Sequence, residues 1–175
     1  MVCSDRLLLG GKKIAKIVFI AGYANTGKTS LMKNLIKVFK EKGFRVAAVK
    51  HAPHGYDLDV EKRDTWHFCQ AGADRVVVVG PKSLTMHHLY DQEPSFGEVC
   101  EMIQDVDLIL VEGYKREQGP KVEVVRKGID ERPDLGDELI AIVSDDHIEE
   151  RVPCFSTESV EQLADFLIDK LSLRK

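Results

Sequence analysis

Residues 22–29 carry the spacing of a phosphate-binding loop. They are Gly-Tyr-Ala-Asn-Thr-Gly-Lys-Thr, and they match every specified position of G-x-x-x-x-G-K-[ST]. Backbone N–H groups of such a loop surround a phosphate, and its glycines adopt conformations that other residues resist. The lysine brings positive charge to the outer phosphates, and the threonine hydroxyl binds Mg²⁺. The sequence therefore predicts that a nucleoside triphosphate and Mg²⁺ bind here, through Gly22, Asn25, Thr26, Gly27, Lys28, Thr29 and Ser30.

Acidic side chains that can complete the metal site occur in two other places. Asp57 and Asp59 occupy alternate positions and point the same way if that segment is extended. Glu112 ends a buried apolar run over 107–112. We expect Thr29, Asp57, Asp59 and Glu112 to supply the metal ligands, with Glu112 and Asp59 orienting the water or substrate. A solvated strand end at Glu112 and an ordinary acidic turn at 57–59 remain alternatives.

The base is expected to be recognised by an acid after another apolar run. Residues 139–143 are followed by Ser144, Asp145 and Asp146. A carboxylate accepts hydrogen bonds from the neighbouring N1–H and N2 amino groups of guanine and repels the N1 acceptor of adenine. Asp145 is therefore predicted to favour GTP, with Asp146 in reserve. The chain lacks the Asn-Lys pair usual before such an aspartate, so a polar turn or a helix cap remains an alternative.

The elements that must position these residues alternate between strands and helices. Apolar, β-branched runs predict strands at 17–21, 45–50, 75–80, 107–112, 121–125 and 139–143. Helical periodicity or capping signals predict helices over 29–42, from 64 to about 72, over 94–105 and from 159 onward. This order indicates a three-layer α/β fold like that of P-loop NTPases, with a mostly parallel sheet flanked by helices. Residues 84–90 alternate weakly and suit an extra edge or hairpin strand.

Length and composition indicate one domain with small-molecule partners. The 175 residues are expected to form a flexible leader at 1–13 and a single nucleotide-binding domain at 14–175. A net charge of −4 argues against nucleic acid as the main partner. No apolar run approaches the ~18–20 residues that span a bilayer, so no membrane partner is expected. The four cysteines form no Cys-x-x-Cys pair, which is typical of reduced thiols in a cytoplasmic protein.

The loop and several later segments together resemble the MobB family of molybdopterin-guanine dinucleotide biosynthesis adapters. These segments are 49–51, 57–59, 63–66, 71–73 and 110–115, which occur in the family's order and extend the resemblance over most of the chain. The resemblance implies a small, dimeric, weak GTPase that associates with the guanylyltransferase attaching GMP to molybdopterin. The chain departs from the family pattern at Ala52-Pro53 and Lys62-Arg63, where ligand binding is expected to differ.

Three functions use the same loop. The first is the GTP-binding adapter, with GTP and Mg²⁺ as ligands and with molybdopterin or its guanylyltransferase as partner. The second is a small-molecule kinase, for which Arg116, Arg126 and Arg132 offer phosphate-clamping side chains. The third is a metal-delivery GTPase, which would need a compact set of Cys and His ligands. A homodimer is expected, partly through the strand at 84–90.

Overall fold

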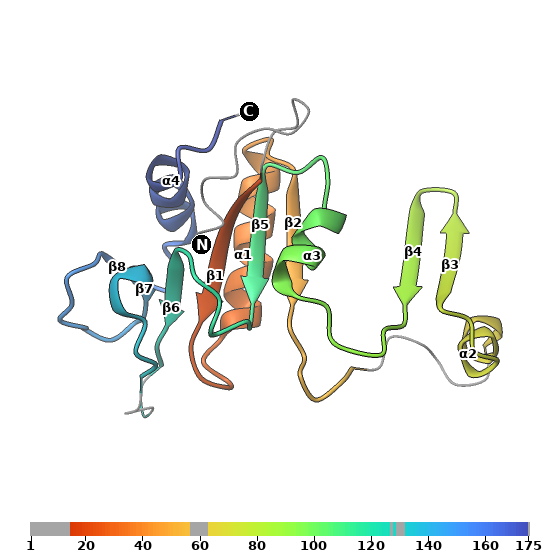
Figure 1. The fold of residues 1–175 in the computed structure, drawn as a ribbon. Coiled ribbons are helices and arrows are strands. Elements are labelled where there is room, and N and C mark those ends of the chain that lie inside the picture. The colour runs from red at the N-terminus through yellow and green to blue at the C-terminus, as the bar shows by residue number, and fades with distance from the viewer. Residues whose placement is uncertain (1–14, 57–62, 127, 129–131, 175) are drawn as a thin grey trace. The chain divides into compact units, whose positions relative to one another are not determined.

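The computed structural model describes residues 15–56, 63–126, 128 and 132–174 (Figure 1). The chain groups into two compact units, of which the first comprises residues 1–51 and 100–175 and the second comprises residues 52–99. Each unit is described by itself. The leader predicted at 1–13 lies outside the described residues, so the predicted division into leader and single domain stays a prediction.

The first unit contains a six-stranded sheet whose strands are all parallel, in the order β2-β5-β1-β6-β7-β8. Their bounds are β1 Lys16–Ala21, β2 Val46–Lys50, β5 Leu108–Glu112, β6 Lys121–Val124, β7 Leu139–Val143 and β8 Cys154–Phe155. The chain leaves every strand at the same edge, because all of the strands are parallel. The predicted α/β class with a mostly parallel sheet is therefore confirmed.

Two amphipathic helices pack together against one face of this sheet (Figure 1). They are α1, Lys28–Glu41, and α4, Val160–Lys170. Leu35 and Phe39 of α1 and Leu163 and Leu167 of α4 are fully buried in a core that also contains Val18 and Ile20 of β1. Since side chains alternate along a strand, Phe19 points to the opposite face of the sheet.

The second unit contains the helix α2, Asp64–Gln70, and an antiparallel hairpin of β3, Arg75–Gly80, with β4, Ser83–His88. The hairpin confirms the expected extra strand near 84–90. Residues 75–80 form the strand that their apolar run predicts, and among the described strands β3 pairs only with β4. Its run of valines is typical of a buried strand, yet Val77, Val78 and Val79 are all exposed.

Short elements and helix ends differ most from expectation. Helix α3, Phe96–Met102, is shorter than the predicted 94–105 and crosses the boundary between the two units. The strand β8 and a 3₁₀ turn, Gly136–Glu138, were not predicted. Ser159 begins α4 but makes no capping hydrogen bond, since its hydroxyl pairs with that of Ser156 at 2.8 Å.

Among the described residues, no helix has both the length and the apolar character needed to cross a membrane.

Candidate nucleotide site

The phosphate loop connects the end of β1 to the start of α1, as its spacing predicts. Gly22 has a φ of +133°, and a Cβ there would lie 2.5 Å from the carbonyl oxygen of Val124. Gly27 begins α1 with a φ of +101°, and Asn25 adopts a positive φ of 62°. Both conformations favour glycine or asparagine over other residues. The loop sequence is thus the one that this tight turn beside β6 requires.

The carbonyl oxygen of Tyr23 accepts two hydrogen bonds inside the loop. The Thr26 hydroxyl donates to it at 3.0 Å, and the Lys28 ammonium group donates to it at 2.5 Å. Thr26 is only 6% exposed, so its hydroxyl fastens the loop internally. Lys28 has a flexible stem, and its ammonium group is free to turn from the carbonyl to a phosphate.

Sheet register places Glu112 beside the loop. Strand β5 lies between β2 and β1, and Glu112 is in register with Lys50 on one side and Ile20 on the other. The Thr29 hydroxyl donates to Glu112 Oε2 at 3.3 Å. Gly113 makes this strand end possible, because a Cβ there would lie 2.7 Å from the Cβ of His51. The structure therefore brings together two of the four predicted metal ligands, whose hydroxyl and carboxylate oxygens are the ligand type that Mg²⁺ prefers.

Two further cations border the loop. Arg126, two residues beyond β6, donates from Nη1 to the carbonyl oxygen of Asn25 at 3.4 Å. Lys50 ends β2. Both line a cavity of about 540 Å³, whose other lining residues are Ala24, Asn25, Gly27, Lys28, Thr29, Ser30 and Glu112. Sequence reasoning treated Arg126 only as a possible kinase arginine and gave Lys50 no role. Lys50 is the last residue of β2 and Arg126 closely follows β6, and both strands end at the same edge of the sheet as the loop.

The cavity has an excess of positive charge. Burial lowers the pKa of Lys28 below its ordinary value, and nearby Lys115 and Lys50 lower it further, whereas Glu112 acts in the opposite direction. Several like charges close together with one carboxylate are costly until an anion binds among them. The electrostatics of this cavity thus favour a polyphosphate.

The remaining predicted residues stand apart from this cavity or outside the structure. Asp57 and Asp59 lie outside the described residues. Asp145, beyond the end of β7, is not among the lining residues. Its Oδ1 accepts from the backbone N–H of Thr157 at 2.8 Å, and the Thr157 hydroxyl lies 2.8 Å from both carboxylate oxygens. These bonds lower the pKa of Asp145, the backbone bond most strongly. Oδ2 keeps lone pairs that can accept a further donor.

The contact between Thr29 and Glu112 gives a first test of the metal site. We expect Thr29→Ala to weaken Mg²⁺-dependent binding of GTP by roughly tenfold, because a metal ligand is lost. Binding measured in EDTA should change by less than about twofold. Calorimetry at several Mg²⁺ concentrations measures both values, with Thr85→Ala as a control that removes an exposed threonine hydroxyl from β4. An unchanged Mg²⁺ dependence would remove Thr29 from the metal site.

Comparison with known proteins agrees with the fold. The sequence profile of MobB, described as molybdopterin guanine dinucleotide synthesis protein B, matches residues 17–145. The molybdopterin-guanine dinucleotide biosynthesis adapter protein of Escherichia coli K12 is 31% identical over 168 residues, which are 92% of this chain and 96% of that protein. The adapter protein of Haemophilus influenzae Rd is 28% identical over 159 residues, which are 85% of each chain. The crystal structure of Bacillus subtilis MobB superposes with a TM-score of 0.73 at 26% identity, covering 89% of this chain and 98% of that one.

Proposed function

The chain belongs to the family of molybdopterin guanine dinucleotide synthesis protein B, and from this premise we propose that it is a GTP-binding adapter with weak GTPase activity. It assists the attachment of GMP to molybdopterin, working in the cytoplasm with the guanylyltransferase that catalyses this step. Relatives that carry the name of adapter protein in molybdopterin-guanine dinucleotide biosynthesis support this role.

The proposal rests on one observation: Lys28, Thr29 and Glu112 line the same cavity, and the Thr29 hydroxyl contacts the Glu112 carboxylate. Lys28 offers a cation to the outer phosphates, and the loop offers its backbone N–H groups. Thr29 and Glu112 would hold Mg²⁺, which neutralises charge on the phosphates. Glu112 also orients the attacking water. Arg126 extends from the end of β6 to the loop and would stabilise the charge on the transferred phosphoryl group.

Calorimetric titration of GTP and of ATP with Mg²⁺ tests the nucleotide specificity, with Asp145 as the residue that we expect to select guanine. Asp145→Asn should weaken GTP binding by roughly tenfold or more and spare ATP, since a charge-assisted hydrogen bond is worth about 1.5–3 kcal/mol. Asp146→Asn tests the residue held in reserve, and Asp169→Asn, which changes an exposed carboxylate on α4, is the control. Equal binding of GTP and ATP by the parent protein would favour the kinase alternative, and an unaltered preference in both variants would place base recognition elsewhere.

We further propose a homodimer that forms through the β3–β4 hairpin. Val77 lies opposite Met86 and Val79 opposite Leu84, so these four side chains share one face. They are 49%, 56%, 73% and 60% exposed, respectively. Such a contiguous apolar face is costly in water and is typical of an interface.

The mass in solution tests this interface. At micromolar concentration we expect sedimentation to give twice the chain mass of 19.7 kDa. Leu84→Lys should shift the protein to the single mass, because a charge would be buried at the interface. Thr85→Lys adds the same charge on the opposite face and should leave the dimer intact. A parent protein that sediments as a monomer would remove the proposed interface.

A further inference from the structure

The turn that follows β5 contains two consecutive residues in the left-handed region. Gly113 has a φ of +99° and Tyr114 a φ of +48°. Glycine adopts a positive φ readily, whereas a tyrosine in this region is strained and stays there only where its surroundings hold it. Glu112, the last residue of β5, leads directly into this turn. The backbone that carries the Glu112 carboxylate is therefore continuous with a strained turn, whose geometry depends on neighbouring contacts.

His51, the residue after β2, contacts Glu112 and both residues of the turn. Its backbone N–H donates to the carbonyl oxygen of Glu112 at 2.8 Å. A Cβ on Gly113 would lie 2.7 Å from the His51 Cβ, so only a glycine permits the two chains to approach this closely. The imidazole ring stacks on the Tyr114 ring, with the ring centres 4.2 Å apart and the planes inclined by 14°. His51 thus holds the strained turn against the end of β2.

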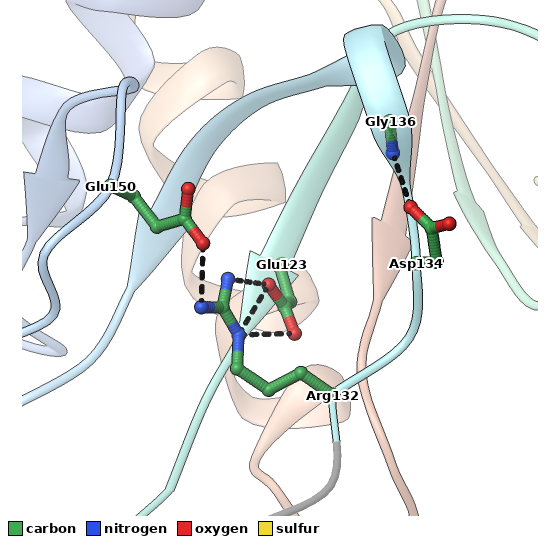
Figure 2. Close-up of polar contacts among 5 residues, drawn as sticks. All are labelled: Glu123, Arg132, Asp134, Gly136 and Glu150. Carbon is green, nitrogen blue, oxygen red and sulfur yellow. Dashed lines mark hydrogen bonds and ion pairs between the residues drawn. The ribbon is translucent and has the colours of Figure 1, made fainter.

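The strand on the other side of β1 is held by buried charge instead (Figure 2). Glu123 of β6 is 1% exposed and accepts hydrogen bonds from Arg132 Nη2 at 2.5 Å and Nε at 3.1 Å. Arg132 Nη1 also donates to Glu150 at 2.9 Å. A buried ion pair is costly to break, so these bonds fix the end of β6 beside the loop. The stack of His51 on Tyr114 has the corresponding place after β5, the other strand that borders β1.

The Glu112 carboxylate depends on this support. Its hydrogen bond from the Thr29 hydroxyl is 3.3 Å long, which is weaker than an ordinary bond from a hydroxyl to an oxygen. A group that orients a reacting water must be placed accurately, since an error of about 1 Å can cost roughly a hundredfold in rate. His51 borders Glu112 in an adjoining cavity of about 430 Å³, but neither His51 nor Tyr114 lines the cavity in which the phosphates are proposed to bind. The two rings therefore act on hydrolysis through the turn that they hold.

We propose that His51 is a positioning residue for GTP hydrolysis. By holding the turn at 113–114 through its stack on Tyr114, it keeps the Glu112 carboxylate at the place where it orients water. This inference rests on the proposed function, which assigns that role to Glu112. Without the ring, the strain at Tyr114 is released by a change of the turn, and the end of β5 moves with it. Nucleotide affinity then stays nearly constant, because the phosphate loop and Lys28 are unchanged, while the rate of hydrolysis falls.

Single-turnover hydrolysis of GTP by the full-length protein, together with calorimetry using a non-hydrolysable GTP analogue and Mg²⁺, tests the proposal. His51→Ala should lower the rate by roughly tenfold and change the affinity for the analogue by less than about threefold, because it disturbs Glu112 rather than phosphate binding. His51→Phe keeps a flat ring for the stack and should recover most of the parental rate. An unchanged rate in His51→Ala would overturn the proposal. A His51→Phe variant as slow as His51→Ala would also overturn it, because the imidazole would then act by its own chemistry.

His67→Ala is the matched control. His67 lies on α2, is exposed, and has its ring beside that of Trp66, with the ring centres 5.0 Å apart. The variant therefore also removes an imidazole from an aromatic contact, at a place that lines neither cavity. It should hydrolyse GTP at the parental rate. A loss as large as that of His51→Ala would mean that the rate responds to any lost imidazole contact, which contradicts the specific role of His51.

A double-mutant cycle with Glu112→Gln identifies the route of the effect. Because His51 acts through the Glu112 carboxylate, His51→Ala should lower the rate of the Glu112→Gln variant by less than about twofold. Tyr114→Ala removes the other ring of the stack and should behave as His51→Ala does in both backgrounds. A further loss of roughly tenfold in the Glu112→Gln background would mean that His51 acts independently of Glu112, and the proposal would fall.

Binding of Mn²⁺ in place of Mg²⁺ keeps this inference distinguishable from the proposed function. Free Mn²⁺, measured by electron paramagnetic resonance with the analogue bound, reports on Glu112 as a metal ligand and needs no hydrolysis. His51→Ala should weaken Mn²⁺ binding by roughly fivefold, and His51→Phe should restore it. A parent protein that hydrolyses no GTP contradicts the proposed GTPase, and the positioning of Glu112 then stands or falls with the Mn²⁺ result. A parent that hydrolyses GTP, with rate and Mn²⁺ binding unchanged in His51→Ala, overturns the positioning alone.

Discussion

Lys28→Ala is expected to weaken GTP binding by roughly 10- to 100-fold while leaving the melting temperature without ligand within about 2 °C of the parent. The loss in affinity follows from the removal of a charge-assisted hydrogen bond to phosphate, worth about 1.5–3 kcal/mol. The melting temperature changes little because burial makes the charged Lys28 unfavourable in the fold, and the neighbouring Lys115 and Lys50 oppose the attraction of Glu112. Its hydrogen bond to the Tyr23 carbonyl offsets only part of that cost.

Calorimetry with GTP and Mg²⁺, together with thermal unfolding, measures both effects. Lys33→Ala is the matched control, since it removes an exposed lysine from the same helix. An affinity equal to that of the parent would remove the phosphate-loop assignment. A large fall in the melting temperature without ligand would instead mean that Lys28 mainly stabilises the loop.

Glu112→Gln is expected to lower the rate of GTP hydrolysis by roughly 100-fold and to change GTP affinity by less than about threefold. Glutamine has nearly the same shape and keeps an oxygen to accept from the Thr29 hydroxyl, so the loop geometry is preserved. The glutamine oxygen can still coordinate Mg²⁺, but the variant loses the negative charge that we propose orients water, which matters most in the transition state. An effect on the rate without an effect on binding is the kinetic signature of such a residue.

Single-turnover hydrolysis separates the chemical step from nucleotide binding and product release. Glu149→Gln is the control, because it removes an exposed carboxylate beyond β7. If Glu112→Gln hydrolyses GTP at the parental rate, the carboxylate that orients water must belong to another residue, and Asp59 becomes the first candidate.

The sequence predicts the parts of this molecule that local patterns determine. The phosphate loop has fixed spacing and sits between a buried strand and an amphipathic helix, so its place and its positive-φ positions follow from residue types alone. The buried run at 107–112 likewise predicts that Glu112 ends a strand. Its contact with Thr29, 83 residues away in the chain, depends on β5 lying next to β1, and strand order is a tertiary property.

Which side chains are buried is also a tertiary property that local sequence patterns do not determine. The valines of β3 are typical of a buried strand, but burial depends on what packs against them: Val76 is buried, whereas Val77, Val78 and Val79 are exposed on a hairpin. Lys121 and Glu123 are charged, yet both are buried, and Glu138 and Arg132 pair with them from a later segment. No local pattern reveals such partners. These two buried pairs were therefore beyond sequence reasoning.

The central claim is tested most directly by measuring formation of molybdopterin guanine dinucleotide in a reconstituted reaction. Purified guanylyltransferase is given molybdopterin, GTP and Mg²⁺, alone, with this protein, or with its Lys28→Ala variant. The account predicts that the parent protein raises the initial rate or the yield several-fold above the transferase alone, and that Lys28→Ala does so far less. A parent protein that binds GTP but leaves product formation at the level of the transferase alone would contradict the account.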